Sequence, residues 1–190
     1  KRVYAVEPNK EMRESAEELF AGAGNVVSVN GSAEATTLSD QAVDLIVAAQ
    51  AFHWFDRAAC RAEFKRILRP GGKVALLWNN RLTDTPFLEE YDALLGEYGI
   101  DYAEVNHRNL TDDELSGFLK PFNKKVIPHR GLLSSSEFEG RLLSSSYVPL
   151  PGQANHEILM AEMRGLFRRF AADGKVAFHY ETVMYWGGLE

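Results

Sequence analysis

Short, continuous apolar runs dominate the first 80 residues of the chain. Four such runs are rich in valine, isoleucine, leucine or alanine and are separated by polar or turn residues: Val3–Val6, Val26–Val29, Val43–Ala48 and Lys73–Trp78. An uninterrupted apolar run, in contrast to an alternating one, is typical of a strand that is buried on both faces. The pattern therefore predicts four short parallel strands.

Apolar residues at helical spacing fill two of the intervals between these runs. They are Met12, Ala16, Leu19 and Phe20 in the first interval, and Cys60, Phe64, Ile67 and Leu68 before the last run. Asn9 is placed to cap the first helix, and Pro70-Gly71-Gly72 is placed to end the second. Strands that alternate with helices predict an α/β fold with a mostly parallel sheet.

After residue 80 the helical spacing of apolar residues continues, but strand-like runs become rare. Helices are expected around 87–95, 111–119, 134–143 and 159–170, and two further strands around 123–132 and 176–186. We interpret residues 82–172 as a mostly helical insertion or lid inside a single domain, 1–190. The final strands would complete the sheet, the last one antiparallel.

Composition narrows the possible functions. The 190 residues are 45% hydrophobic and 25% charged, which is typical of a folded chain and excludes a disordered tail. A net charge of −6 disfavours nucleic acid as a partner. No apolar run approaches the roughly 20 residues that span a bilayer. The expected partner is a small molecule, with neither nucleic acid nor membrane, and the expected assembly is a monomer or homodimer.

Cys60 is the only cysteine, so neither an internal disulfide nor a thiolate metal site is expected. This predicts a reducing, cytoplasmic location and no metal. The chain begins with Lys1-Arg2 followed at once by a strand-like run. Because a natural N-terminus seldom starts inside a sheet, we expect the chain to be N-terminally incomplete.

The most informative single residue is Glu7, which follows the first run and precedes a helix. Ligands of open α/β sheets bind at the carboxyl ends of the strands, where a carboxylate can accept hydrogen bonds from both ribose hydroxyls of a nucleoside. The alternative is a surface glutamate in the first turn of a helix, where the helix dipole favours it.

Three further segments follow the ends of later strands. Residues 30–35 form a turn that could present a backbone N–H to a purine, or could be a plain loop. Residues 50–56 combine an amide, an imidazole and three aromatic rings, which is unusual for a loop that binds nothing. Trp78-Asn79-Asn80-Arg81 ends the next strand; the alternatives there are core packing for the ring and a solvated charge for the guanidinium.

In their order and spacing these segments resemble the class I S-adenosylmethionine-dependent methyltransferases. The motifs are Val3-Tyr-Ala-Val-Glu-Pro-Asn9, Gly31-Ser-Ala-Glu34, Asp44 to Phe55, and Phe64 to Leu76. The similarity is closest to the methyltransferase type 11-like branch that contains trans-aconitate-methyltransferase-like enzymes, and it is dense over residues 3–81. The family's first strand and Gly-rich loop have no counterpart in the chain.

The resemblance implies roles for particular residues. The cofactor, S-adenosyl-L-methionine, would be held by Glu7, Met12, Ser32, Ala33, Glu34 and Gln50. Many relatives carry aspartate in place of Ser32, so recognition of the adenine amino group by this side chain departs from the family pattern. The substrate would face Trp54, Asn79, Asn80, Arg81 and Tyr147, with His53 as the catalytic residue.

Methyl transfer from a sulfonium is an in-line displacement, so the enzyme mainly aligns the reactants. A carboxylate acceptor is already ionised and needs no base; Arg81, Asn80 or Arg141 could orient it. A hydroxyl acceptor would use His53 as a base. Two other functions stay open: a non-catalytic binding protein with this fold, and a nicotinamide-dependent dehydrogenase, which also has an acidic residue after its second strand.

Overall fold

The computed structural model describes residues 1–102 and 111–189. The chain divides into two compact units. Unit 1 contains Lys1–Leu77, Asp112–Lys124 and Met184–Glu190, and unit 2 contains Trp78–Thr111 and Lys125–Val183. The division does not test the single-domain interpretation or the lid role of residues 82–172, which stay predictions; residues 103–110 of that segment lie outside the described residues.

Unit 1 begins with a βαβ segment made of β1 (Val3–Val6), α1 (Lys10–Leu19) and β2 (Val26–Val29). The two strands pair in parallel from Val3↔Val26 to Val6↔Val29. Asn9 caps α1, because its Oδ1 accepts the N–H of Met12 at 3.0 Å. The helix and its cap are therefore predicted correctly.

The apolar face of α1 is not buried, in contrast to the other helices. No residue of the helix is buried, and Met12 and Leu19 are 63% and 76% exposed. Helical spacing reports an apolar stripe, whereas burial also requires a surface that covers the stripe.

The second part of unit 1 contains β3 (Val43–Ala49), the 3-10 turn η1 (Phe52–Trp54) and α2 (Arg57–Ile67), and leads into β4 (Leu68–Arg81). β3 and β4 pair in parallel. The predicted inner face of α2 is buried, with Cys60 fully enclosed. β4 extends beyond the predicted run at both ends. β1 and β2 form a sheet separate from that of β3 and β4 in the described part of the chain, where a single sheet was expected.

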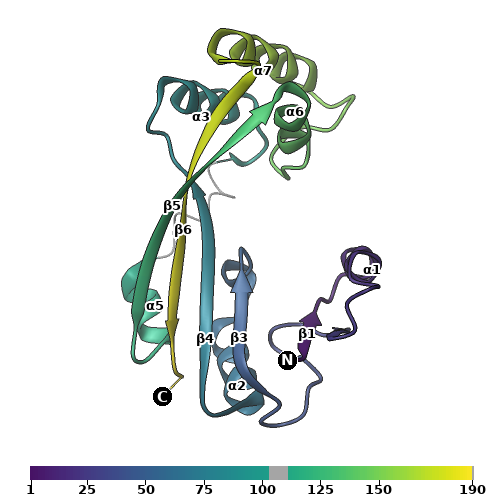
Figure 1. The fold of residues 1–190 in the computed structure, drawn as a ribbon, viewed down its shortest axis with the longest axis vertical. Coiled ribbons are helices and arrows are strands. Elements are labelled where there is room, and N and C mark those ends of the chain that lie inside the picture. The colour runs from purple at the N-terminus through teal and green to yellow at the C-terminus, as the bar shows by residue number, and fades with distance from the viewer. Residues whose placement is uncertain (103–110, 190) are drawn as a thin grey trace. The chain divides into compact units, whose positions relative to one another are not determined.

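The larger sheet has the strand order β3-β4-β6-β5, with β5 (Asn123–Ser134) and β6 (Lys175–Gly187) added after β4. Near the end of β4, the Leu82 N–H donates to the His179 carbonyl and the Thr182 hydroxyl donates to the Asn79 side chain. These pairings show that β4 and β6 run antiparallel. Figure 1 shows β6 pointing opposite to both of its neighbours. α5 (Asp112–Phe118), which belongs to unit 1, precedes β5 in the chain. The mixed α/β sheet with an antiparallel final strand is confirmed.

Unit 2 contains α3 (Pro86–Tyr98), α6 (Ser135–Leu143) and α7 (His156–Phe170). Its core is rich in aromatic rings; the fully enclosed members include Tyr91, Phe138 and Phe178. Ser134 and Glu137 form the capping box that opens α6. Over the described ranges, no helix combines the length and the apolar character needed to cross a membrane.

One buried carboxylate fixes the segment between β2 and β3. Glu63 on α2 accepts the N–H of Thr36 at 2.8 Å, and Arg66 donates to both of its oxygens at 2.8 Å. Arg66 also donates to Asp40 at 2.7 Å. The hydrogen bonds from Arg66, followed by those from Thr36, lower the pKa of Glu63 from 4.5 to about 2. Residues 36–40 are therefore held against α2.

We expect Glu63→Gln to lower the free energy of unfolding at pH 7 by about 3 kcal/mol, because it removes the charged partner of a buried network. The pKa of Glu63 in the folded protein lies below its usual 4.5. The stabilisation that its carboxylate contributes is therefore complete above pH 4.5 and is lost as the pH falls toward about 2. Urea unfolding followed by circular dichroism between pH 7 and 3 measures it. Glu18→Gln, on the exposed face of α1, is the matched control. An unchanged slope of stability against pH in Glu63→Gln would contradict the assignment.

Candidate functional site

Glu7 lies directly after β1 and is half-buried. Its Oε1 accepts the N–H of Asn9 at 2.8 Å, which fixes the carboxylate at the entry to α1. Within residues 1–102 and 111–189, Oε2 receives no hydrogen bond and the carboxylate has no ion pair. The side chain is therefore held by one oxygen and has the other available for a hydroxyl donor.

Arg13 supports this arrangement and was not predicted. Its Nη1 donates to the backbone carbonyl of Glu7 at 3.0 Å and to the Oδ1 of Asn30 at 3.3 Å. It thereby ties the end of β1 to the residue that follows β2. The only sequence signal is its place on the second turn of a helix that starts after Glu7; the partner Asn30 is distant in the chain.

Residues Gly31 to Ala35 form a tight turn. The N–H of Ser32 donates to the Ala35 carbonyl at 3.1 Å and the reverse bond measures 3.2 Å, which places Ala33 and Glu34 at the tip. A Cβ at Gly31 would lie 2.8 Å from the Ala35 carbonyl oxygen, so only glycine fits. The Ser32 N–H is thus used inside the turn and does not remain for a purine.

Glu34, a predicted cofactor residue, has a structural contact. Its Oε1 accepts the N–H of Asp56 at 3.0 Å. Asp56 in turn caps α2 by accepting the N–H groups of Ala58 and Ala59. Glu34 therefore fixes the turn to the segment that carries η1.

Gln50 ends β3 in a left-handed conformation, with φ of 54°. Its N–H donates to the Leu77 carbonyl at 2.9 Å, which holds this geometry in place. A side chain in this region costs about 1 kcal/mol, and such strain is commonly retained at functional sites. The role of Gln50 at the cofactor stays a prediction.

In η1 the aromatic residues have distinct environments. Phe52 is buried and packs edge-on against Phe118, at 4.7 Å between centroids. Trp54 is 72% exposed and lies 4.8 Å from the ring of His53. Burial lowers the pKa of His53 below its usual 6.5, so the imidazole is neutral at pH 7 and can accept a proton.

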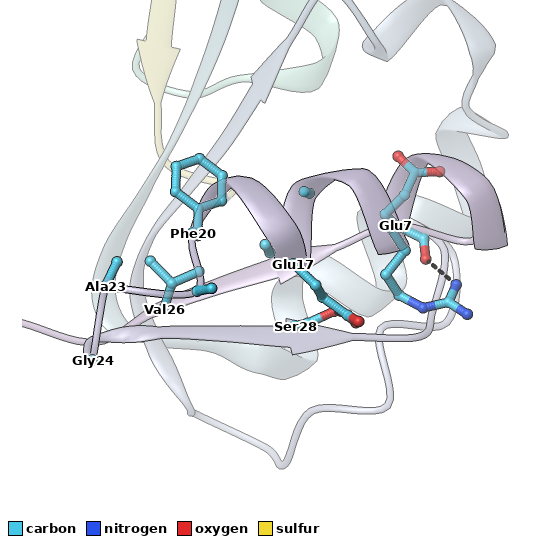
Figure 2. A pocket seen from close by; sticks show the side chains of 11 residues that line it. Glu7, Glu17, Phe20, Ala23, Gly24, Val26 and Ser28 are labelled. Atoms are coloured by element: carbon cyan, nitrogen blue, oxygen red, sulfur yellow. Dashed lines mark hydrogen bonds between the residues drawn. The ribbon is translucent and has the colours of Figure 1, made fainter.

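A pocket of about 340 Å³ lies beside α1, β1 and β2. Figure 2 shows Glu7 at one end and the apolar side chains of Phe20 and Val26 at the other, with the dashed hydrogen bond from Arg13 to the Glu7 backbone. The volume is at the lower limit for small-molecule sites. Of the predicted cofactor residues, only Glu7 lines it, so it does not account for the others.

Unit 2 holds the remaining predicted residues. Arg81 donates through Nη2 to Asp92 at 2.5 Å and to the Tyr102 hydroxyl at 2.6 Å, and its guanidinium lies 4.5 Å from the Tyr91 ring centroid. The ring of Tyr147 is 5.0 Å from that of Tyr102.

The structure thus brings Arg81 and Tyr147 to the same group of aromatic side chains. Asn79 and Asn80 lie just before Arg81 in β4, both half-buried, and Asn79 accepts a bond from Thr182.

The residues of unit 1 fit a nucleoside cofactor on one observation, the open Oε2 of a Glu7 carboxylate that is already fixed by its other oxygen. A carboxylate in this position is suited to a ribose hydroxyl. Within the described part of the chain, no group of three His, Cys, Asp or Glu side chains is placed to hold a metal ion.

Solved structures with similar folds show which fold the chain has. A candidate type II methyltransferase from Anaeromyxobacter dehalogenans aligns with a TM-score of 0.70 at 22% identity, over 99% of this chain and 80% of that one. A candidate methyltransferase from an antibiotic biosynthesis pathway of Anabaena variabilis aligns with a TM-score of 0.60 at 23% identity, over 98% and 81%. The fold is that of the class I methyltransferases, as predicted.

Sequence matches cover the first part of the chain. Residues 1–76 match the family described as methyltransferase domain. A methyltransferase-like protein of Schizosaccharomyces pombe, itself uncharacterised, is 39% identical over 98 residues, 52% of this chain and 37% of its own. An uncharacterised methyltransferase of Mycobacterium tuberculosis is 38% identical over 97 residues, 51% and 39%. The chain spans about two fifths of the length of these curated relatives. The resemblance to class I methyltransferases is confirmed.

We expect Gly31→Ala to lower the free energy of unfolding by about 1–3 kcal/mol, since the added methyl group meets backbone oxygens of the turn. Gly22→Ala is the matched control, because a Cβ there meets nothing within 4 Å. Thermal unfolding of both variants measures the difference. Equal melting temperatures for the two would show that the turn can move aside.

Proposed function

We propose that the protein transfers a methyl group from S-adenosyl-L-methionine to a small-molecule acceptor. When bound, this cofactor supplies a methyl group on a positively charged sulfur with a neutral leaving group. The protein's task is then mainly alignment of the two reactants. The match of residues 1–76 to the methyltransferase domain and the class I fold support this function.

The observation that carries the proposal is a hydrogen-bonded connection between the predicted cofactor segments of unit 1. Arg13 joins Glu7 to Asn30, and Glu34 joins the following turn to Asp56, next to η1. A site held in this way before the ligand arrives loses less conformational entropy on binding.

Within this site we assign Glu7 to the ribose hydroxyls and Gln50 to the methionine part. We also assign Met12, which is exposed on α1, to one face of the adenine, and Ser32 and Ala33 to the adenine edge. Because Glu34 is bonded to Asp56, we assign it to positioning the turn and not to direct contact.

For the acceptor we propose an oxygen atom of a carboxylate or hydroxyl group. A malonyl-[acyl-carrier protein] O-methyltransferase of Methylococcus capsulatus is 46% identical over 55 residues, 28% of this chain and 20% of its own. In this chain Trp54, Asn79, Asn80, Arg81 and Tyr147 are the proposed substrate residues, and His53 is the proposed base where the acceptor is a hydroxyl.

We further propose that the protein works in a reducing cytosol, as a monomer or homodimer, with a small molecule as its partner. Its single cysteine, Cys60, is fully enclosed, and burial raises the pKa of the thiol to about 11. A neutral, enclosed thiol reacts slowly, so oxidation at this position is not expected.

Calorimetric titration of S-adenosylhomocysteine into the full chain tests the cofactor. We expect micromolar affinity, with a loss of about 10–100-fold in Glu7→Ala, because charge-assisted hydrogen bonds contribute about 1.5–3 kcal/mol. Glu7→Gln keeps a hydrogen-bond acceptor for the N–H of Asn9, so its affinity should lie between those of the wild type and Glu7→Ala. Glu11→Ala, one turn further along α1, is the control and should bind normally. Absence of binding to the folded full-length protein, including any residues that precede Lys1, would favour a non-catalytic binding protein.

The pH dependence of methyl transfer distinguishes the two acceptor types. For a hydroxyl acceptor, His53→Gln should reduce the rate by about 10²–10⁴-fold. In the wild type that rate should fall only below the usual imidazole pKa, because burial lowers the pKa of His53. For a carboxylate acceptor, the variant should retain its rate within about threefold. A loss of carboxylate methylation in His53→Gln would contradict the base-free mechanism.

A further inference from the structure

Arg141 on α6 has a guanidinium that lies over two aromatic rings. Its Cζ lies 4.9 Å from the ring centroid of Tyr180 and 5.7 Å from that of Phe178. Both rings are buried in β6, whereas Arg141 is exposed. A cation–π contact of this kind restrains a guanidinium and leaves N–H groups to donate to a planar oxyanion.

Three other arginines of unit 2 are neutralised by carboxylates. Arg81 pairs with Asp92, Arg164 with Glu139 and Arg169 with Glu90. In the described part of the chain, no carboxylate lies within ion-pair distance of Arg141. Arg130 and Arg168 also lack such a partner, but among the described residues neither guanidinium lies over an aromatic ring. Arg141 is therefore the arginine of this unit that is both oriented and without a counter-charge among the described residues.

A second guanidinium acts on the same tyrosines. Arg81 and Arg141 both favour the ionised hydroxyls of Tyr91 and Tyr180, and Tyr147 acts on both of these hydroxyls. These five side chains are called the arginine–tyrosine cluster. Burial nevertheless raises the pKa of Tyr91 and of Tyr180, so both phenols keep their protons and can donate hydrogen bonds. Asp92 is the carboxylate that pairs within the cluster, and it offsets one of the two positive charges.

We propose that the arginine–tyrosine cluster binds the carboxylate of a small anionic ligand, with Arg141 as the bidentate partner. This inference rests on the proposed function: the ligand is the methyl acceptor, and the bound carboxylate is either the group that is methylated or a second acidic group of the same molecule. The cluster has one uncompensated positive charge. This matches a carboxylate group, which carries one negative charge, better than a phosphate group, which carries two. A phenol next to the guanidinium supplies a neutral donor, and Arg81 contributes its charge from a more enclosed position, since its side chain is only 12% exposed.

Titration of the full chain with succinate, followed by the NMR signals of arginine Nε–H groups and tyrosine rings, tests this site. We expect saturable shifts at the Arg141 and Tyr180 signals, and about tenfold weaker binding in Arg141→Gln, which corresponds to 1.4 kcal/mol. Arg141→Lys keeps the charge but loses the planar fork, so it should bind more weakly than the wild type. Succinamide, which has the same shape without charge, should not bind.

Arg168→Gln is the matched control, because it removes the same charge from an exposed arginine without a ring beneath it. Equal loss in Arg168→Gln and Arg141→Gln would mean general charge attraction and would overturn the proposal. Unchanged succinate affinity in Arg141→Gln would also overturn it. Preference for inorganic phosphate over succinate at the same signals would replace the carboxylate with a different ligand class.

This measurement does not depend on methyl transfer. If S-adenosylhomocysteine fails to bind while succinate binds at Arg141, the anion site stands and the proposed activity falls. If S-adenosylhomocysteine binds and succinate does not, the activity stands and the acceptor is recognised elsewhere. Where both bind, Arg141→Gln should raise the KM for an acidic acceptor much more than it lowers kcat.

Discussion

The buried carboxylate of Glu63 is the interaction on which the arrangement of unit 1 depends. It accepts hydrogen bonds from Thr36 and from Arg66, which also reaches Asp40, so the segment after β2 is fastened to α2. The turn at Gly31–Ala35 immediately precedes this anchor, and Glu34 adds a second attachment at Asp56. Polar groups that are fully paired in this way restrict a loop to one conformation, because every alternative leaves a buried charge unsatisfied. The geometry proposed for the adenine edge is thus set by residues that do not touch a ligand.

Much of the fold could be predicted because burial leaves a local trace in the sequence. The apolar stripe of α7 and the apolar run of β3 are examples, and the capping box of Ser134 and Glu137 predicted the start of α6. The exposure of α1 could not be predicted, because its stripe is as regular as the others and only the neighbouring elements decide what covers it. The same holds for the separation of β1 and β2 from β3 and β4, since strand pairing is set by contacts between segments that are remote along the chain.

The candidate site shows the same division. Glu7 and Gln50 could be proposed as site residues from the sequence because each directly follows a strand, and ligands bind at strand ends in α/β folds. Arg141 could be named only by its side-chain type. What makes it distinctive is its place over Tyr180 and Phe178, which follow it by more than thirty residues. Tyr91 and Tyr180 gave no signal beyond that of core aromatics, and Arg13 none beyond that of a helical charge.

The exposure of α1 also bears on how its sequence is expected to evolve. A helix without buried side chains contributes little packing energy, so most replacements on it cost only their helix propensity, which is below about 1 kcal/mol. Within the described residues, selection for a stable fold therefore acts weakly on the apolar stripe of this helix. Arg13 is also selected for its hydrogen bonds to Glu7 and Asn30, whereas a Met12 that persists among descendants of the same gene reports selection on ligand binding.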